Sequence, residues 1–380
     1  MTDYSSSASA SPDRHSIFMR QALDLALLGR WTAPPNPAVG AVVVLNDTIV
    51  GQGYHERPGT PHAEVVALES AGADSRGATL YVTLEPCNHH GRTPPCTEAI
   101  LEAGIQRVVV AAEDPCRHDC DAGIERLREQ AVEVISGVEG AAASQLNARY
   151  FLASRDDRPI VIAKSARTLD GRTMGPGRKP LAVTGSEALE QVGCRRSEVD
   201  AILIGSGTVL ADDPRLSARR VDGSLLDRQP VRVVADGRLR MSPQARIVTS
   251  PGGPVWVLTS RSMLDSPEAT SLKDAGTKLI GVPLSPDGGL DEREMLESLR
   301  DEGVSGLMIE GGGSLLSSFS SSDLIDHWEV WIAPRVTGLG GGMLVSGIEP
   351  PLQLGDMRVW EFGEDLLVRA LPETMTTIDD

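Results

Sequence analysis

Apolar and polar residues recur with two different periods along the first 150 residues of this chain. From Ile17 to Leu27 the apolar residues follow helical spacing, which predicts an amphipathic helix over residues 16–29. Short apolar runs bounded by turn residues come next and predict strands. We expect strands at 39–45, 48–54, 79–84, 108–112 and 132–135, and helices at 63–70, 97–103 and 124–130. This alternation is typical of a layered α/β domain.

A second strand-rich region follows a short helix and linker that we expect at residues 145–155. Apolar runs predict strands at 159–164, 201–205, 231–235, 255–259, 278–282, 306–309 and 329–333, and the clearest helix lies at 291–302. Strands separated by helices predict a mostly parallel sheet. The chain is therefore expected to hold two α/β domains, at residues 14–150 and 158–372.

The composition limits the partners that these domains can have. The formal net charge of −17 argues against a nucleic-acid partner, because phosphate binding requires a basic face. Residues 1–13 lack the features of a signal or transit peptide and are expected to be a disordered leader. Five cysteines without disulfide spacing fit a reducing cytoplasm, and no apolar run approaches the length of a membrane span.

Three short motifs in the first domain supply the ligands of a zinc site. His62-Ala63-Glu64, Pro86-Cys87 and Pro95-Cys96 offer one imidazole, two thiols and one carboxylate. Zinc binds nitrogen and thiolate in a tetrahedron, and three protein ligands leave a fourth position for a water whose pKa falls to about 7. In zinc deaminases a Glu two residues after the His shuttles protons and does not bind the metal. The motifs therefore predict zinc-dependent hydrolysis of an amine on a nucleobase-like ring.

Each of these residues also has a simpler interpretation. A lone cysteine is commonly a small buried core residue, and a lone histidine is commonly a surface residue. Eight residues separate Cys87 from Cys96, where the zinc-deaminase pattern has two. A longer loop still closes on one metal, because closure entropy grows slowly with loop length. The four residues together favour the metal site.

Two glycine turns in the second domain are candidate phosphate sites. Gly311-Gly312-Gly313 follows an apolar strand that ends at Glu310, and a helix is expected after it. Such a turn presents backbone N–H groups and the positive end of a helix to a phosphate. A plain tight turn is the commoner explanation of such glycines. Gly205-Ser206-Gly207-Thr208 is equally ambiguous by itself.

The motifs of the first domain resemble those of one enzyme family. Asn36-Pro37-x-Val39-Gly40, His62-Ala63-Glu64-Val65 and Glu85-Pro86-Cys87-x-His89-His90-Gly91-Arg92-Thr93-Pro94-Pro95-Cys96 are similar to the deaminase half of the bifunctional riboflavin-biosynthesis deaminase/reductases. The resemblance implies a cytidine-deaminase-like three-layer fold, one zinc ion bound by His62, Cys87 and Cys96, and Glu64 as the catalytic proton donor. The implied substrate is the small phosphorylated pyrimidine 2,5-diamino-6-(5-phosphoribosylamino)pyrimidin-4(3H)-one.

The second domain resembles the reductase half of the same family. The similar segments are Leu169-Asp170-Gly171-Arg172, Gly205-x-Gly207-Thr208-Val209-x-x-Asp212-Asp213-Pro214, Glu310-Gly311-Gly312 and Ile332-Ala333-Pro334. The resemblance implies a dihydrofolate-reductase-like fold with NADPH as the cofactor. The implied NADPH contacts are Thr208, Asp212, Gly312, Gly313, Ser314, Leu315, Leu316, Ser317 and Ser318. The implied substrate contacts are Arg196, Leu216, Arg219 and Glu310, of which the two arginines suit the ribose phosphate because guanidinium forks match phosphate geometry.

Two segments depart from the family pattern. After Pro115 the chain reads Cys116-Arg117-His118-Asp119-Cys120 and has lost a base and gained an acid. These Cys and His residues form either a second metal site or a polar loop with incidental thiols. Pro180-Leu181-Ala182 stands where the family has Ser-x-Trp, which removes a hydroxyl for the substrate and an aromatic wall for the cofactor. We expect weaker or altered NADPH binding as a result.

Three functions are compatible with these residues. We expect a cytoplasmic, homo-oligomeric enzyme that deaminates the pyrimidine and then reduces its ribosyl chain with NADPH, without a nucleic-acid or membrane partner. A cytosine or tRNA-adenosine deaminase is the second enzyme class, although the acidic net charge opposes RNA binding. In the third, the second domain is a degenerate binding or dimerisation module beside an active deaminase.

Overall fold

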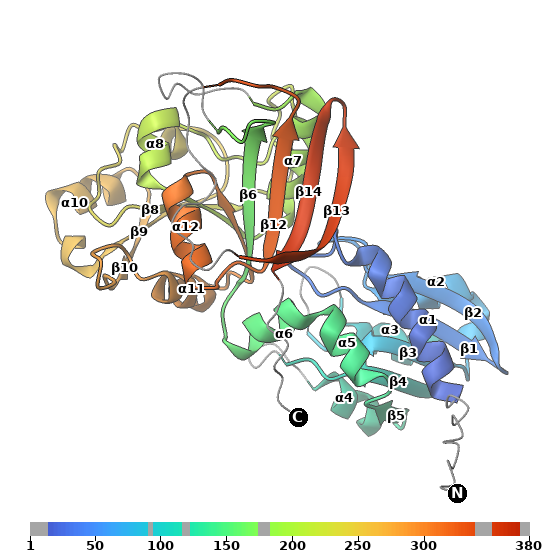
Figure 1. Cartoon of the computed structure of the whole chain (residues 1–380). Coiled ribbons are helices and arrows are strands. Elements are labelled where there is room, and N and C mark those ends of the chain that lie inside the picture. Colours follow the sequence, from blue (N-terminus) through green and yellow to red (C-terminus); the bar gives the residue numbers. More distant parts are fainter. Residues whose placement is uncertain (1–13, 90–93, 116–121, 174–182, 339–351, 373–380) are drawn as a thin grey trace, which may run out of the picture. The chain divides into compact units, whose positions relative to one another are not determined.

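The computed structural model describes residues 14–89, 94–115, 122–173, 183–338 and 352–372. The chain divides into two compact units, Met1–Arg155 and Asp156–Asp380, and each is described by itself (Figure 1). The leader expected at residues 1–13 lies outside the described residues, and the domain limits of 14–150 and 158–372 stay a prediction. None of the described helices has both the length and the apolar character needed to cross a membrane.

The first unit is built on a five-stranded mixed sheet. Its strand order is β2 (Thr48–Tyr54), β1 (Gly40–Leu45), β3 (Thr79–Leu84), β4 (Arg107–Ala112) and β5 (Glu133–Ser136). Strand β1 is antiparallel to both β2 and β3, whereas β3, β4 and β5 are parallel. Strands β2 and β3 therefore run in the same direction, and their carboxyl ends lie at the same edge of the sheet.

Helices cover both faces of this sheet, as close packing at two glycines shows. A Cβ on Gly40 would lie 2.0 Å from the carbonyl oxygen of Ala22 in α1 (Arg14–Gly29). A Cβ on Gly53 would lie 2.6 Å from Val66 Cβ in α2 (Ala63–Ala71). Gly53 is the register partner of Ala41, so Gly40, one residue earlier, points to the opposite face. The unit therefore has three layers, as the sequence predicted.

The remaining helices of this unit are η1 (Gly72–Ser75), α3 (Cys96–Ala103), α4 (Gly123–Glu129), α5 (Gly140–Leu146) and α6 (Ala148–Arg155). The short helix expected within residues 145–155 is α6, and the preceding helix α5, which was not predicted, ends at Leu146. The two helices meet at Asn147. The Asn147 side chain accepts a hydrogen bond from the Ala38 N–H at 2.8 Å and donates one to the Ala38 carbonyl at 2.9 Å. These two bonds tie the junction of α5 and α6 to the residue that lies two positions before β1.

The second unit is built on a nine-stranded sheet (Figure 1). Its order is β10 (Lys278–Val282), β9 (Val255–Ser260), β8 (Val231–Ala235), β7 (Ala201–Gly205), β11 (Gly306–Glu310), β6 (Ile160–Thr168), β12 (His327–Ala333), β14 (Asp365–Pro372) and β13 (Leu354–Phe362). The pairs from β10 to β12 are parallel, as predicted. The antiparallel hairpin of β13 and β14 was not predicted from the sequence.

Connections in this sheet bring three strand ends together. The chain runs outward from β7 to β10 and then returns to place β11 between β7 and β6. The carboxyl ends of β11, β7 and β8 therefore lie side by side, and ligands of open α/β sheets bind outside such ends. The described helices of this unit are α7 (Ser186–Glu198), α8 (Ser206–Asp212), α9 (Arg246–Thr249), η3 (Arg261–Met263), α10 (Pro267–Asp274), α11 (Glu292–Asp301) and α12 (Gly313–Ser321).

Candidate metal centre and reductase site

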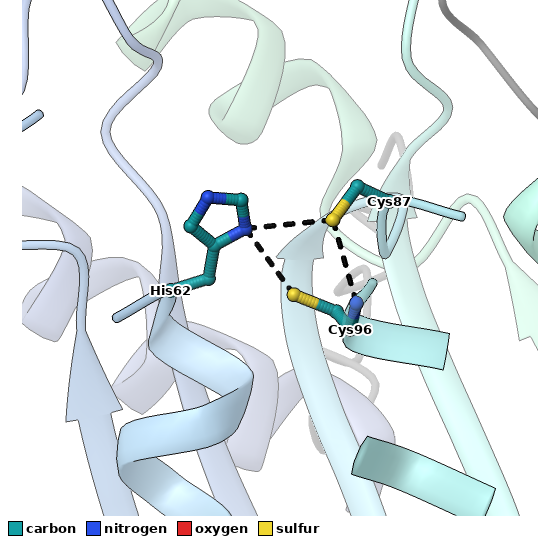
Figure 2. A group of neighbouring side chains, drawn as sticks. All are labelled: His62, Cys87 and Cys96. Atoms are coloured by element: carbon teal, nitrogen blue, oxygen red, sulfur yellow. Dashed lines mark hydrogen bonds between the residues drawn. The ribbon is translucent and has the colours of Figure 1, made fainter. Parts of the chain in front are cut away.

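His62, Cys87 and Cys96 converge at one edge of the first sheet (Figure 2). His62 immediately precedes α2, Cys87 follows the end of β3, and Cys96 is the first residue of α3. The Nδ1 atom of His62 lies 3.2 Å from Cys96 Sγ and 3.5 Å from Cys87 Sγ. The three ligand atoms all lie within 4.8 Å of one another. Tetrahedral zinc separates nitrogen and sulfur ligands by roughly 3.5 Å, so this donor set fits zinc.

Hydrogen bonds close the eight-residue loop between the two cysteines. The Thr97 N–H donates to the Cys87 carbonyl at 3.2 Å, and the Thr97 hydroxyl donates to Asn88 Oδ1 at 2.7 Å. The Cys96 N–H points at Cys87 Sγ from 3.4 Å. These contacts hold the ends of the loop together, which explains why the wide spacing does not separate the thiols. Residues 90–93 of the loop lie outside the described part of the chain.

Hydrogen bonds and burial shift the pKa values of the two thiols and of the imidazole. A hydrogen bond with Cys96 holds the pKa of the Cys87 thiol well below its usual value, and the same contact raises the pKa of Cys96. Burial alone would lower the pKa of His62, but the hydrogen bond with Cys87 and the charge of Glu64 raise it. A bound metal replaces the protons of these groups, because zinc ligands must be deprotonated.

Glu64 lies in the first turn of α2 beside this centre. Its side chain is 3% exposed, and burial raises the pKa of its carboxyl group. The charge of His62 and a hydrogen bond with Cys96 oppose that rise. A carboxyl group with a raised pKa is able to accept and return a proton near neutral pH.

His55 is a buried neighbour of the centre that the sequence did not single out. Its ring lies edge-on to His62, with centroids 5.3 Å apart. The Nδ1 atom is 3.2 Å from the Pro61 carbonyl, and Nε2 is 3.0 Å from Asn36 Nδ2. Both contacts are satisfied when Nδ1–H donates to Pro61 and Nε2 accepts from Asn36. A single histidine after a strand carries no recognisable spacing, so only the fold reveals this contact.

In the second unit, Arg196 and Glu310 form a bidentate ion pair. The Arg196 Nε and Nη2 atoms donate to the two Glu310 oxygens at 2.7 and 2.9 Å. Lys164 Nζ lies 3.5 Å from Glu310 Oε2, and Arg196 Nη1 donates to the Ser217 carbonyl at 3.2 Å. The fork of Arg196, which we expected to face the ribose phosphate, is therefore directed at Glu310.

Arg219 lies close to this pair and belongs to a cationic cluster. Burial and the charges of Arg196, Arg215 and Arg246 lower the pKa of Arg219, and Glu310 opposes them. Arg219 Nη1 donates to the carbonyl and the hydroxyl of Ser217 at 3.3 and 3.2 Å. The sequence did not indicate Arg215 and Arg246, because arginines scattered over thirty positions are usually solvated surface residues.

The predicted NADPH residues in the segments that follow β7 and β11 lie against each other. Gly311 has a positive φ of 87°, and a Cβ on Gly312 would come to 3.3 Å from Thr208 Oγ1. The turn before α12 thus meets α8, and side chains in place of these glycines would fill the space between them. Leu316 is only 1% exposed and packs in the core, so its side chain is not available to a cofactor.

Leu216 and Asp212 lie in the segment that begins in α8. Leu216 is buried and adopts a positive φ of 54°, whereas Asp212 is exposed. The expectations for Cys116, His118 and Cys120, and for Pro180-Leu181-Ala182, fall outside the described residues.

The two sites define a class of enzyme in which a zinc-binding deaminase unit precedes a reductase unit. Residues 12–112 match the family model of the cytidine and deoxycytidylate deaminase zinc-binding region, and residues 159–368 match the RibD C-terminal domain. The chain belongs to the RibD family of riboflavin-biosynthesis proteins. The first unit has the cytidine-deaminase-like fold and the second the dihydrofolate-reductase-like fold.

Individual relatives match over nearly the whole chain. The riboflavin biosynthesis protein RibD of Aquifex aeolicus is 39% identical over 354 residues, covering 92% of this chain and 96% of that protein. The Escherichia coli RibD is 38% identical, covering 91% and 95%. The structure of Acinetobacter baumannii RibD matches with a TM-score of 0.69 at 33% identity, covering 95% and 99%. That of the Thermotoga maritima diaminohydroxyphosphoribosylaminopyrimidine deaminase/5-amino-6-(5-phosphoribosylamino)uracil reductase matches with a TM-score of 0.65 at 31% identity, covering 94% and 99%.

Proposed function

We propose that this chain catalyses two successive reactions of riboflavin biosynthesis. The first unit deaminates 2,5-diamino-6-(5-phosphoribosylamino)pyrimidin-4(3H)-one by hydrolysis. The second reduces the ribosyl chain of 5-amino-6-(5-phosphoribosylamino)uracil to a ribityl chain with NADPH. The observation that carries the first assignment is the convergence of His62, Cys87 and Cys96 within 4.8 Å beside buried Glu64. Family membership across both units supports the second.

In the deaminase unit, His62, Cys87 and Cys96 would hold zinc. Zinc bound to three protein ligands lowers the pKa of a water at its open position to about 7. Glu64 accepts a proton from the attacking water and delivers it to the exocyclic amino nitrogen. The bond between that nitrogen and the ring carbon breaks, ammonia leaves, and the water oxygen stays on the carbon. Burial of Glu64 supports this role, because the raised pKa makes its protonated form accessible. His55 fixes the environment of His62 through its edge-on contact.

In the reductase unit, the cationic cluster is the place for the ribose phosphate of the substrate. Glu310 occupies the fork of Arg196, so Arg196 serves mainly to position Glu310. Arg219, with Arg215 and Arg246 nearby, then supplies the positive charge for the phosphate. Guanidinium groups bind phosphate oxygens in pairs, which supports Arg219 as the principal phosphate contact.

The same unit offers a site for NADPH between Thr208 of α8 and the glycine turn at Gly312. We call this site the cofactor cradle. Gly312 precedes and Gly313 begins a nine-residue helix, α12, whose N-terminus favours a pyrophosphate. Thr208 borders the cradle, and a Cβ at Gly312 would narrow it. NADPH supplies the hydride for the reduction. We assign Gly312 to Leu315, Ser317, Ser318, Thr208 and Asp212 to the cofactor. Leu316 is left out of this set, because its side chain is buried and its N–H donates to the Gly312 carbonyl at 3.3 Å.

Two coupled assays test this proposal. Purified protein should release ammonia from the diaminopyrimidine, and should oxidise NADPH when it is given the deaminated intermediate. Ammonia release without NADPH oxidation or NADPH binding would leave the deaminase-only alternative. Turnover of cytidine in place of the phosphorylated pyrimidine would contradict the substrate assignment.

We also propose a homo-oligomer in a reducing compartment such as the cytoplasm. Among the described residues, the three cysteines form no disulfide, and two of them are needed as thiolates. Strand β13 ends the sheet order and exposes Met357 and Val359, and an apolar edge strand of this kind is usually covered by another surface. Light scattering of the purified chain tests the oligomer, and a monomeric mass would contradict it.

A further inference from the structure

A short loop at the carboxyl end of β8 presents two arginines to solvent. The loop follows Ala235 and turns back at Leu239, whose N–H donates to the Asp236 carbonyl at 3.1 Å. Leu239 is 4% exposed and adopts a positive φ of 49°. Because Leu239 anchors the loop in the core, its neighbours Arg238 and Arg240 are exposed.

Arg240 is the arginine directed toward the cofactor cradle. Its Nη2 atom donates to the hydroxyl of Ser206 at 2.7 Å. Ser206 is the first residue of α8 and lies two positions before Thr208, which borders the glycine turn of β11. Strands β7 and β8 are in register with Gly205 opposite Ala235, so the segments that follow them are neighbours. The guanidinium of Arg240 therefore lies beside the end of the cradle that is nearer to β8.

The spacing of the sheet relates this arginine to the proposed pyrophosphate position. Strands β11, β7 and β8 are consecutive in the sheet, and neighbouring strands lie about 4.8 Å apart. The end of β8 is thus about 10 Å from the glycine turn of β11. A dinucleotide whose pyrophosphate binds at that turn is long enough to extend its adenosine ribose across β7 toward β8.

The one carboxylate in this loop faces inward. Asp236 is 1% exposed, and its Oδ2 accepts the Met241 N–H at 2.7 Å. Its Oδ1 lies 3.8 Å from Arg240 Nε. Sites that prefer NADH present an acid to the ribose 2′-hydroxyl, whereas an arginine accommodates a 2′-phosphate. A buried acid under an exposed arginine therefore matches the phosphorylated cofactor.

We propose that Arg240 binds the 2′-phosphate of NADPH and gives the reductase unit its preference for NADPH over NADH. The inference rests on the proposed reductase function. A guanidinium that already donates one hydrogen bond to Ser206 is held in place, and its remaining N–H groups would donate to the phosphate oxygens. Loss of such charge-assisted hydrogen bonds weakens binding by roughly 10- to 100-fold.

Calorimetry with two nucleotide fragments tests this role without measuring turnover. The wild type should bind adenosine 2′,5′-bisphosphate more tightly than adenosine 5′-monophosphate. Arg240→Ala should weaken the bisphosphate by roughly 10- to 100-fold, to the level of the monophosphate. Arg240→Lys should retain part of the difference, because lysine keeps the charge without the fork. Dissociation constants for NADPH and NADH from cofactor fluorescence should follow the same order.

Two other arginines serve as matched variants on the full-length protein. Arg261→Ala removes an exposed arginine at the end of β9, one strand farther out, and should preserve the discrimination between the fragments. The proposal would be overturned if Arg240→Ala still preferred the bisphosphate over the monophosphate as strongly as the wild type does. It would also be overturned if Arg238→Ala lost this preference and Arg240→Ala kept it. A wild type that binds neither NADPH nor NADH would instead refute the proposed reductase function, so the two failures are distinguishable.

Discussion

Glu310 accepts both arms of the Arg196 guanidinium, at 2.7 and 2.9 Å. The pair joins α7 to the end of β11, where the substrate of the reductase unit is proposed to bind. An arginine in such a bidentate pair has little capacity left for a phosphate. The pairing therefore shifts the task of holding the substrate phosphate to Arg219 and the cations around it.

Arg219→Gln should raise the KM for the phosphorylated uracil by roughly 10- to 100-fold, because a charge-assisted contact to the phosphate is lost. The affinity for NADPH should stay near the wild-type value. Steady-state kinetics and fluorescence titration measure the two quantities separately. Arg220→Gln is the control, since Arg220 is exposed and pairs with Glu190 at 3.1 Å. An equal effect of the two substitutions would contradict a specific phosphate contact.

Glu310 should make the free energy of unfolding of the second unit decrease as the pH falls below about 4.5. Burial alone would raise the pKa of Glu310, but the charges of Arg196 and Lys164 lower it to about 2, from an ordinary 4.5. The unfolded chain then takes up this proton at a higher pH than the folded one. The stabilisation is complete above about pH 4.5, is lost as the pH falls toward 2, and amounts to ~3 kcal/mol.

Urea unfolding of the wild type and of Glu310→Gln measures this contribution. The difference in free energy of unfolding between the two proteins should shrink between about pH 6 and about pH 3. Glu302→Gln is the control, because Glu302 forms an exposed ion pair with Lys278, and such pairs contribute about 1 kcal/mol or less. A difference that does not vary with pH would show that Glu310 is not charged in the folded protein.

Cys96→Ser should lower the zinc content from about one ion per chain to well below one, because a hydroxyl is a poor zinc ligand. Ammonia release should disappear with the zinc. NADPH oxidation on the deaminated intermediate should persist, since Cys96 belongs to the first unit. Elemental analysis of the purified variant makes the measurement. Cys194→Ser, in α7 of the second unit, is the matched control and should keep its zinc; full zinc occupancy in Cys96→Ser would exclude Cys96 as a ligand.

Glu64→Gln should keep the zinc and lower the rate of deamination by roughly 10²- to 10⁴-fold, the usual range for loss of a general acid–base group. Glu69→Gln tests the same helix at an exposed position and should have little effect. Ammonia release under substrate saturation measures the rate. Deamination at the wild-type rate by Glu64→Gln would require another proton carrier.

The zinc centre was predictable from sequence because its ligands lie in short motifs next to strongly patterned elements. Strand β3 is a run of buried apolar residues, so its end, and Cys87 after it, could be placed from the sequence. The prediction that His62 and the two thiols approach one another depended on β2 and β3 running in the same direction. The sequence did not contain that information, but the fold confirms it.

The hairpin of β13 and β14 escaped prediction for a different reason. Strand β14 places charged Arg369 among apolar residues, and the local pattern is not that of a buried strand. In the structure, Arg369 Nε lies 3.4 Å from Glu329 Oε1 of β12, which also accepts Arg195. A charge is tolerated in such a position only when a partner distant in sequence neutralises it.

By itself, the sequence determined the two α/β units, most strand positions and the composition of the metal site, because these follow from local periodicity and from the identities of neighbouring residues. The tertiary structure alone decided that Glu310 occupies the fork of Arg196, that His55 contacts His62, and that Arg240 reaches Ser206. Each of these contacts joins residues from different elements, and their positions follow from strand order and packing. No local pattern encodes a long-range pairing of side chains, so these parts of the sites became visible only in the folded chain.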